Sequence, residues 1–95
     1  MVSSLGNFAS RALDLRNKAD ATLKGGFLSR MFGSKQDRAD EAKDLYVQAA
    51  NAYKHSKDPE NAVEMYMKCI ECEPDDGFKA NYYRDASRVI AASDT

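Results

Sequence analysis

The sequence predicts an all-α, single-domain protein in which the helices pack as antiparallel hairpins. Apolar residues recur at steps of three and four positions in four separate stretches, which is the period of an amphipathic helix. No stretch alternates β-branched and polar residues in the manner of a half-buried strand. The length of 95 residues is enough for one domain.

The first predicted helix occupies residues 1–24, and the second runs from Gln36 to Lys54. Gly25-Gly26 ends the first helix, whose apolar stripe consists of Leu5, Phe8, Ala12, Leu15, Ala19 and Leu23. The second helix carries small and aromatic side chains on one face, namely Ala39, Ala42, Leu45, Tyr46, Ala49, Ala50 and Tyr53.

The third and fourth predicted helices each follow a capping signal. Asp58-Pro59-Glu60 places Asp at the N-cap, Pro at the first helical position and a carboxylate near the positive end of the helix dipole. This helix carries Ala62, Tyr66, Cys69 and Ile70, and it stops before Pro74. Asp75 and Asp76 are expected to cap the fourth helix, which ends near Ala92 and carries Phe78, Tyr82, Tyr83, Ala86, Val89 and Ile90.

The second and fourth helices share a pattern of small and aromatic residues 36 positions apart. The corresponding pairs are Tyr46 with Tyr82, Ala50 with Ala86 and Tyr53 with Val89. Helix hairpins of the tetratricopeptide type repeat after about 34 residues. We therefore expect residues 36–93 to form a tetratricopeptide-like stack of the right-handed α-α superhelix class, with alanines where helices approach closely and tyrosines beside them.

The residues indicate no catalytic site, no metal site and no cofactor. Cys69 and Cys72 form a CxxC pair, but zinc needs four ligands and a thioredoxin-type motif needs a βαβ context. We interpret both cysteines as structural. His55 stands alone without a nearby nucleophile, and no phosphate-binding glycine motif is present. A net charge of −1 and the lack of basic residues interleaved with aromatic ones predict no nucleic-acid partner.

Positive charge is concentrated near the beginning of the chain. Residues 1–35 carry six basic and two acidic side chains, whereas residues 36–95 carry eight basic and thirteen acidic ones. Four large apolar side chains stand within the loop 25–35, namely Phe27, Leu28, Met31 and Phe32. Either this loop fills the gap between the first two helices, or it inserts into a membrane interface with Lys24, Arg30 and Lys35 near anionic headgroups.

Residues 27–58 resemble the N-terminal region of the soluble NSF attachment proteins, the α-SNAP family. An apolar loop with Met-Phe-Gly precedes an acidic helix that carries the family pattern in Glu41, Ala42, Tyr46, Ala49, Ala50, Asn51, Tyr53, Lys54 and Lys57. The similarity continues through Ala62, Tyr66 and Lys68 and resumes over residues 79–87.

This resemblance implies an adaptor for SNARE disassembly in vesicle transport and membrane fusion. It favours membrane binding by the apolar loop. The expected localisation is cytoplasmic, with peripheral association with membranes. The implied partner is a SNARE complex of syntaxin-type helices, and we expect it to contact Lys54, Lys57, Arg84 and Arg88. The NSF ATPase is an expected partner only of a full-length family member, because the family's C-terminal segment that engages NSF has no counterpart in these 95 residues.

Some positions depart from the family pattern. Pro59 stands where the family usually has Trp, and Ala91-Ala92 occupy the positions of a lysine pair that helps bind SNAREs. The alternative interpretation is a small tetratricopeptide-type protein-binding module, such as a peptide-clamping fragment. Val47 argues against that alternative, because a carboxylate clamp would need a lysine there.

Overall fold

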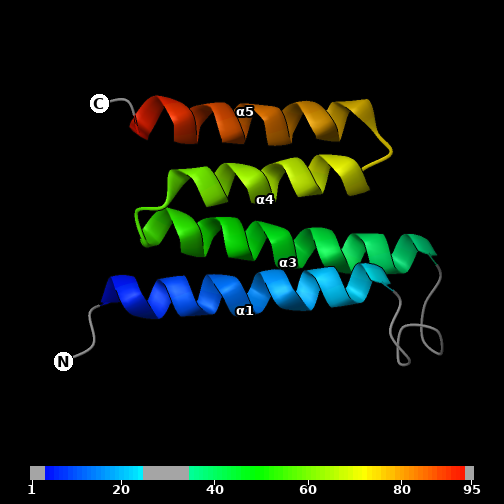
Figure 1. Ribbon diagram of the computed structural model, residues 1–95. Helices are drawn as coiled ribbons and strands as arrows, with labels where there is room; N and C mark the ends of the chain where they lie inside the picture. The colour runs from blue at the N-terminus through cyan, green and yellow to red at the C-terminus, as the bar shows by residue number, and fades with distance from the viewer. Residues whose placement is uncertain (1–3, 25–34, 94–95) are drawn as a thin grey trace.

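The computed structural model describes residues 4–24 and 35–93, which form four antiparallel α-helices. These are α1 (Ser4–Lys24), α3 (Lys35–His55), α4 (Pro59–Cys72) and α5 (Asp76–Ser93). They lie side by side in chain order (Figure 1), and the described part of the chain contains no strand. The predicted all-α fold of helix hairpins is confirmed.

The helices form a single layer. The molecule measures 44 × 37 × 12 Å, and the smallest dimension is about the diameter of one helix. Each helix packs mainly on the helices that precede and follow it in the sequence. Among the four described helices, α3 and α4 therefore have a helix on both sides, and α1 and α5 have one on a single side.

Alanine supplies most of the core between these helices. Of the 15 buried apolar residues in the described part of the chain, eight are alanines. Ala50 is fully buried and Ala86 is 5% exposed, as the 36-residue pattern predicts. Small side chains let the helix axes approach closely, and the buried rings of Tyr46, Tyr53 and Tyr66 fill the remaining space.

Two polar contacts fix α1 against the rest of the layer. The hydroxyl of Tyr46 in α3 donates a hydrogen bond to Asp20 Oδ1 in α1. Arg16 in α1 donates to Glu64 Oε1 in α4 at 3.3 Å, so this ion pair spans α3. Both partners of the ion pair are partly exposed, and such pairs contribute at most about 1 kcal/mol. Their main effect is to fix the relative position of the helices.

The predicted caps of α4 and α5 are present. Asp58 Oδ1 accepts a hydrogen bond from the Asn61 N–H at 3.2 Å, and Asp75 Oδ1 accepts one from the Phe78 N–H at 3.1 Å. A Cβ at Gly77 would lie 3.0 Å from Asp75 Oδ1, which explains the glycine in this first turn.

The neighbouring Asp76 acts differently from its predicted role. Its carboxylate lies in the first turn of α5, where a negative charge favours the helix dipole, and 3.8 Å from Lys79 Nζ. The Asp75 carboxylate, by contrast, accepts the Phe78 N–H in the first turn, so Asp75 is the residue that caps α5.

A nearly buried ion pair ties α3 to the turn between α4 and α5. Lys43 Nζ lies 2.7 Å from Glu73 Oε1, and these side chains are only 12% and 7% exposed. A second contact joins Lys43 Nζ to Asp40 Oδ1 at 3.1 Å, and Glu73 Oε2 accepts the Asp75 N–H at 3.2 Å. Burial by itself would lower the pKa of Lys43, but the hydrogen bonds to Glu73 and Asp40 outweigh it and raise that pKa.

Several residues of the predicted apolar patterns are exposed, because α1 and α5 are the outer helices of the described layer. Leu23, Phe78 and Ile90 are 41%, 59% and 50% exposed. The apolar patterns of these two helices therefore extend beyond the faces that a neighbouring helix covers. His55 was predicted to stand alone, but its ring stacks on the ring of Phe8, with the two centroids 4.8 Å apart.

Replacing the buried Ala50 by leucine should destabilise the layer. The added methyl groups have no space in the close helix contacts, and such overpacking typically costs about 1–3 kcal/mol. In a chain of this size, each kcal/mol lowers the melting temperature by roughly 4–8 °C. Thermal unfolding followed by circular dichroism measures the shift, with Ala80→Leu at an exposed position of α5 as the matched control. Equal melting temperatures for the two variants would contradict the close packing at Ala50.

The free energy of unfolding should fall as the pH rises above about 10. Burial, and then the hydrogen bond to Asp20, raise the pKa of Tyr46, and the pKa of Lys43 is raised as well. A group with a raised pKa stabilises the folded state below its unfolded-state pKa, and this stabilisation is lost as the pH climbs through the folded-state value. Urea unfolding between about pH 8 and pH 12 measures how steeply the free energy of unfolding falls with pH.

Lys43→Met should make that alkaline slope shallower. The exposed pair Lys68–Glu71, with Nζ and Oε2 3.9 Å apart, provides the control variant Lys68→Met, which should keep the parental slope. If the free energy of unfolding falls equally steeply with pH in the parent, Lys43→Met and Lys68→Met, the Lys43–Glu73 pair does not stabilise the fold.

Candidate functional site

The two ends of the helical layer bring together different sets of predicted binding residues. α1 ends at Lys24 and α3 begins at Lys35 at one end, whereas the α3–α4 turn and the C-terminal end of α5 lie at the other (Figure 1). α3 has 21 residues, so the ends lie about 30 Å apart. A surface at one end can therefore be occupied without hindering the other.

Two of the predicted membrane-binding residues belong to the first of these ends. Lys24 is exposed in the last turn of α1, and Lys35 is the first residue of α3. The remaining members of the set lie outside the described residues; they are Phe27, Leu28, Arg30, Met31 and Phe32. Membrane binding by this loop stays a prediction.

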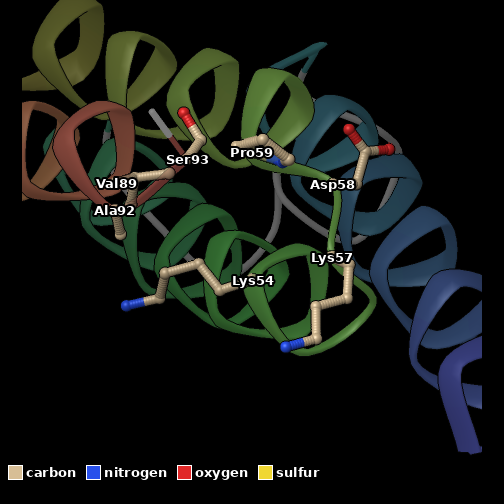
Figure 2. Close-up of a pocket in the computed structure, with 7 residues that line it drawn as sticks. All are labelled: Lys54, Lys57, Asp58, Pro59, Val89, Ala92 and Ser93. Atoms are coloured by element: carbon tan, nitrogen blue, oxygen red, sulfur yellow. The ribbon is translucent and has the colours of Figure 1, made fainter. Parts of the chain in front are cut away.

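A groove of about 400 Å³ opens at the opposite end of the layer, between the α3–α4 turn and the last two turns of α5. Figure 2 shows Lys54 and Lys57 extended toward the same side of it, while the carboxylate of Asp58 points away from them. The other lining residues are Pro59, Val89, Ala92 and Ser93. The groove thus combines two cations with an apolar wall.

Local structure explains where the two lysines stand. Lys54 lies in the last turn of α3, where a cation favours the helix dipole, and its Nζ is 5.9 Å from the centre of the Tyr66 ring. Lys57 follows the helix with a positive φ of 64°, and its N–H donates to the Lys54 carbonyl at 3.1 Å. Both side chains are exposed, and no carboxylate in the described part of the chain forms an ion pair with either.

The two predicted arginines form a separate group on α5. Arg84 and Arg88 lie four positions apart, so they share one face of the helix, and both are exposed. Arg84 Nη2 donates to Asn81 Oδ1 at 2.5 Å. Neither arginine lines the groove, although Arg88 is next to Val89, which does. The four residues expected to bind SNAREs therefore form two pairs.

The CxxC pair has the environment of structural cysteines. Cys69 is fully buried, and its thiol donates to the Lys43 carbonyl at 3.7 Å. Burial raises the pKa of the Cys69 thiol to about 12, and it is also the main cause of the raised pKa of Cys72. Reactive cysteines need a lowered pKa. Among the described residues, no cluster of His, Cys, Asp or Glu has the arrangement of a metal site.

Sequence reasoning identified the lysines but missed the groove beside them. In the sequence, Val89 belongs to the apolar pattern of the fourth predicted helix, and Ala92 lies near the end of that helix. Their part in the groove depends on α4 and α5 running antiparallel, which brings the end of α5 over the start of α4. The predicted antiparallel hairpin places the start of α4 and the end of α5 at the same end of the layer, but which of their side chains line a groove depends on how the two helices pack.

Comparison with protein families supplies an independent line of evidence. The family model described as "Soluble NSF attachment protein, SNAP" matches residues 10–95. No curated protein and no solved structure matches the chain. Within residues 4–24 and 35–93, none of the helices is both long enough and apolar enough to cross a membrane. Since the family match extends over all but the first nine residues and agrees with the all-helical layer, the chain belongs to the soluble NSF attachment protein family.

Proposed function

We propose that this chain is an adaptor that binds a SNARE complex and a membrane surface during NSF-driven SNARE disassembly. The soluble NSF attachment proteins are non-enzymatic adaptors with a role in vesicle trafficking, and the family match carries the proposal. The finer assignment of partners to surfaces is our own inference from the positions of charged and apolar residues.

The proposed membrane binding is supported by the composition of the segment between α1 and α3. Residues 27–32 contain four large apolar side chains, and basic residues flank them. Apolar side chains that enter the interface gain about 1.5–3 kcal/mol each at full burial, and each nearby cation adds about 1 kcal/mol on anionic lipid. Several such groups acting together are enough for reversible peripheral binding.

The proposed SNARE binding is supported by exposed cations at the other end of the layer and on α5. Lys54, Lys57 and Arg88 have no ion-pair partner among the described residues, so they are available to an acidic helix bundle. The separation of about 30 Å between the two ends allows one chain to bind membrane and SNARE complex together. Such simultaneous binding would raise the apparent affinity for a membrane-anchored SNARE complex.

Co-sedimentation with liposomes, with and without an anchored SNARE complex, tests the whole proposal. The chain should sediment with phosphatidylserine-containing liposomes, and more of it should sediment when the SNARE complex is present. Added salt should weaken binding to bare liposomes without abolishing it, because the apolar contribution is not screened. No sedimentation in either case would overturn the proposal.

Replacing Phe27 and Leu28 by serine should lower the liposome partition coefficient by about tenfold or more, since about 1.4 kcal/mol corresponds to a factor of ten. The double variant should keep the parental melting temperature if both side chains act only on the membrane. Leu13→Ser provides the control, because Leu13 is a 51% exposed apolar residue of α1 outside the loop. Unchanged sedimentation together with a melting temperature several degrees lower would mean that the loop residues fill the helix layer instead.

Reversing two charges on α5 should weaken binding to a soluble SNARE complex in the absence of membrane. For Arg84→Glu with Arg88→Glu we expect at least about a tenfold loss of affinity, because attraction to acidic side chains becomes repulsion. Lys18→Glu with Arg11→Glu makes the same charge change on the exposed surface of α1. If both double variants lose the same affinity, the binding depends on net charge and not on a surface of α5.

A further inference from the structure

We propose that a second groove, where α3 begins and α4 ends, receives an arginine side chain of a basic partner polypeptide. This groove has a volume of about 370 Å³ and lies at the opposite end of the layer from Lys54 and Lys57. Its walls come from the first half of α3, the α4–α5 turn and the first two turns of α5. We call it the acidic groove, and the residues that determine its chemistry are Asp40, Lys43, Asp44, Glu73, Phe78 and Tyr82.

Negative charge in the acidic groove exceeds positive charge. Three carboxylates line it, and Lys43 is the one cation among its described lining residues. Lys43 Nζ lies 2.7 Å from Glu73 Oε1 and 3.1 Å from Asp40 Oδ1, but a single ammonium neutralises only one of these carboxylates. Within residues 4–24 and 35–93, no ion pair joins Asp44 to a cation. A cationic partner would therefore meet an excess of negative charge in this groove.

The carboxylates on α3 are accessible and suitably spaced for a guanidinium. Asp40 and Asp44 are both exposed, and because they are four positions apart, their Cβ atoms lie about 6 Å from each other on one face of the helix. Hydrogen bonds from Lys43 and Gln36 lower the pKa of Asp40, so this carboxylate is charged at neutral pH. The guanidinium of arginine has five N–H donors in a planar fork, so it can bind two neighbouring carboxylates at once.

The opposite wall of the acidic groove is aromatic. Phe78 and Tyr82 are four positions apart, so their rings share one face of α5. Tyr82 is partly buried against the core, whereas Phe78 is 59% exposed. A cation within about 6 Å of such a ring is attracted to its face. A guanidinium can stack on an aromatic ring while its edge binds carboxylates, and a lysine ammonium cannot. The two walls together therefore favour arginine.

Negative charge continues along α3 beyond the acidic groove. Asp37 and Glu41 are exposed and lie three positions before Asp40 and Asp44, which places all four carboxylates on the same face of the helix. Among the described residues, no carboxylates are grouped as ligands of a metal ion. A polypeptide with more than one basic residue can use the whole of this face, so it fits the surface better than a single small cation.

Two variants separate the carboxylate wall from the aromatic wall. Asp44→Asn removes one charge outside the buried ion pair, and Phe78→Leu removes a ring but keeps an apolar side chain. Both positions are exposed, so both variants should keep the parental melting temperature. The matched controls are Asp14→Asn at an exposed position of α1 and Tyr83→Leu at a 50% exposed ring of α5, because neither residue lines the acidic groove.

NMR titration of the 95-residue chain with a capped Gly-Arg-Ser-Arg-Gly peptide tests the proposal. The peptide should shift backbone amide signals at the beginnings of α3 and α5. Replacing its arginines by citrulline, which keeps the shape but removes the charge, should weaken binding at least about tenfold, and replacing them by lysine about threefold. Asp44→Asn and Phe78→Leu should each weaken binding of the arginine peptide about fivefold, and the two controls by less than about twofold.

Three results would overturn the proposal. The first is an absence of shifts with the arginine peptide. The second is an equal affinity of the arginine peptide and its citrulline or lysine version, because the groove would then not recognise a guanidinium. The third is an equal loss of affinity in the groove variants and their controls. Co-sedimentation with liposomes and SNARE complex measures the proposed function separately, so either proposal can fail while the other stands.

Discussion

Close contact between alanine-rich helix faces is the constraint on which the rest of this structure depends. A chain of 95 residues buries little apolar surface, and more than half of its buried apolar residues in the described segments are alanines. Alanine gives little burial per residue, so stability requires the helix axes to approach closely and the tyrosine rings to fill what space is left. The helices pack in this way as a layer 12 Å thick, in which each described helix lies mainly against its neighbours in the sequence.

The single layer determines where function can reside. Every helix in such a layer exposes a large part of its surface, so partners have access to most of the molecule. The described turns lie at opposite ends of the layer, and each end gathers residues that are far apart in the sequence. α1 ends and α3 begins at one end, while the groove between Lys57 and Ala92 lies at the other. An adaptor that connects two partners benefits from this separation.

The groove depends in turn on a buried polar interaction at the far end of the layer. Glu73 receives Lys43 from α3 through one oxygen and the Asp75 N–H through the other, which fixes the turn from which α5 starts. Because α5 is an 18-residue rigid helix, this turn also sets where Val89 and Ala92 lie relative to the start of α4. Burying an ion pair is costly unless its hydrogen bonds are complete. Here both carboxylate oxygens of Glu73 have hydrogen-bond partners, and Lys43 has a second one in Asp40.

The sequence by itself determined the local structure and the family of this protein. The three- and four-residue periodicity placed all four helices, Asp58 and Asp75 were identifiable as caps, and the α-SNAP resemblance agrees with the family match. These features are local, because a helix and its cap depend on residues within a few positions of one another. Lys54 and Lys57 were named from the resemblance to the α-SNAP family, and the structure shows that both side chains are exposed.

Only the tertiary structure decided which apolar faces are covered and which residues meet. Periodicity marks an apolar stripe but not the number of neighbours that cover it, so it does not show that Phe78 and Ile90 are exposed, with α5 packed mainly against α4 alone among the described helices. The Lys43–Glu73 pair and the groove of Lys57 with Val89 each join residues about 30 positions apart in the sequence. Such contacts depend on the direction and spacing of whole helices. The physical reason is that the spacing between helices depends on how many side chains from different helices pack together. No single stretch of sequence specifies that packing.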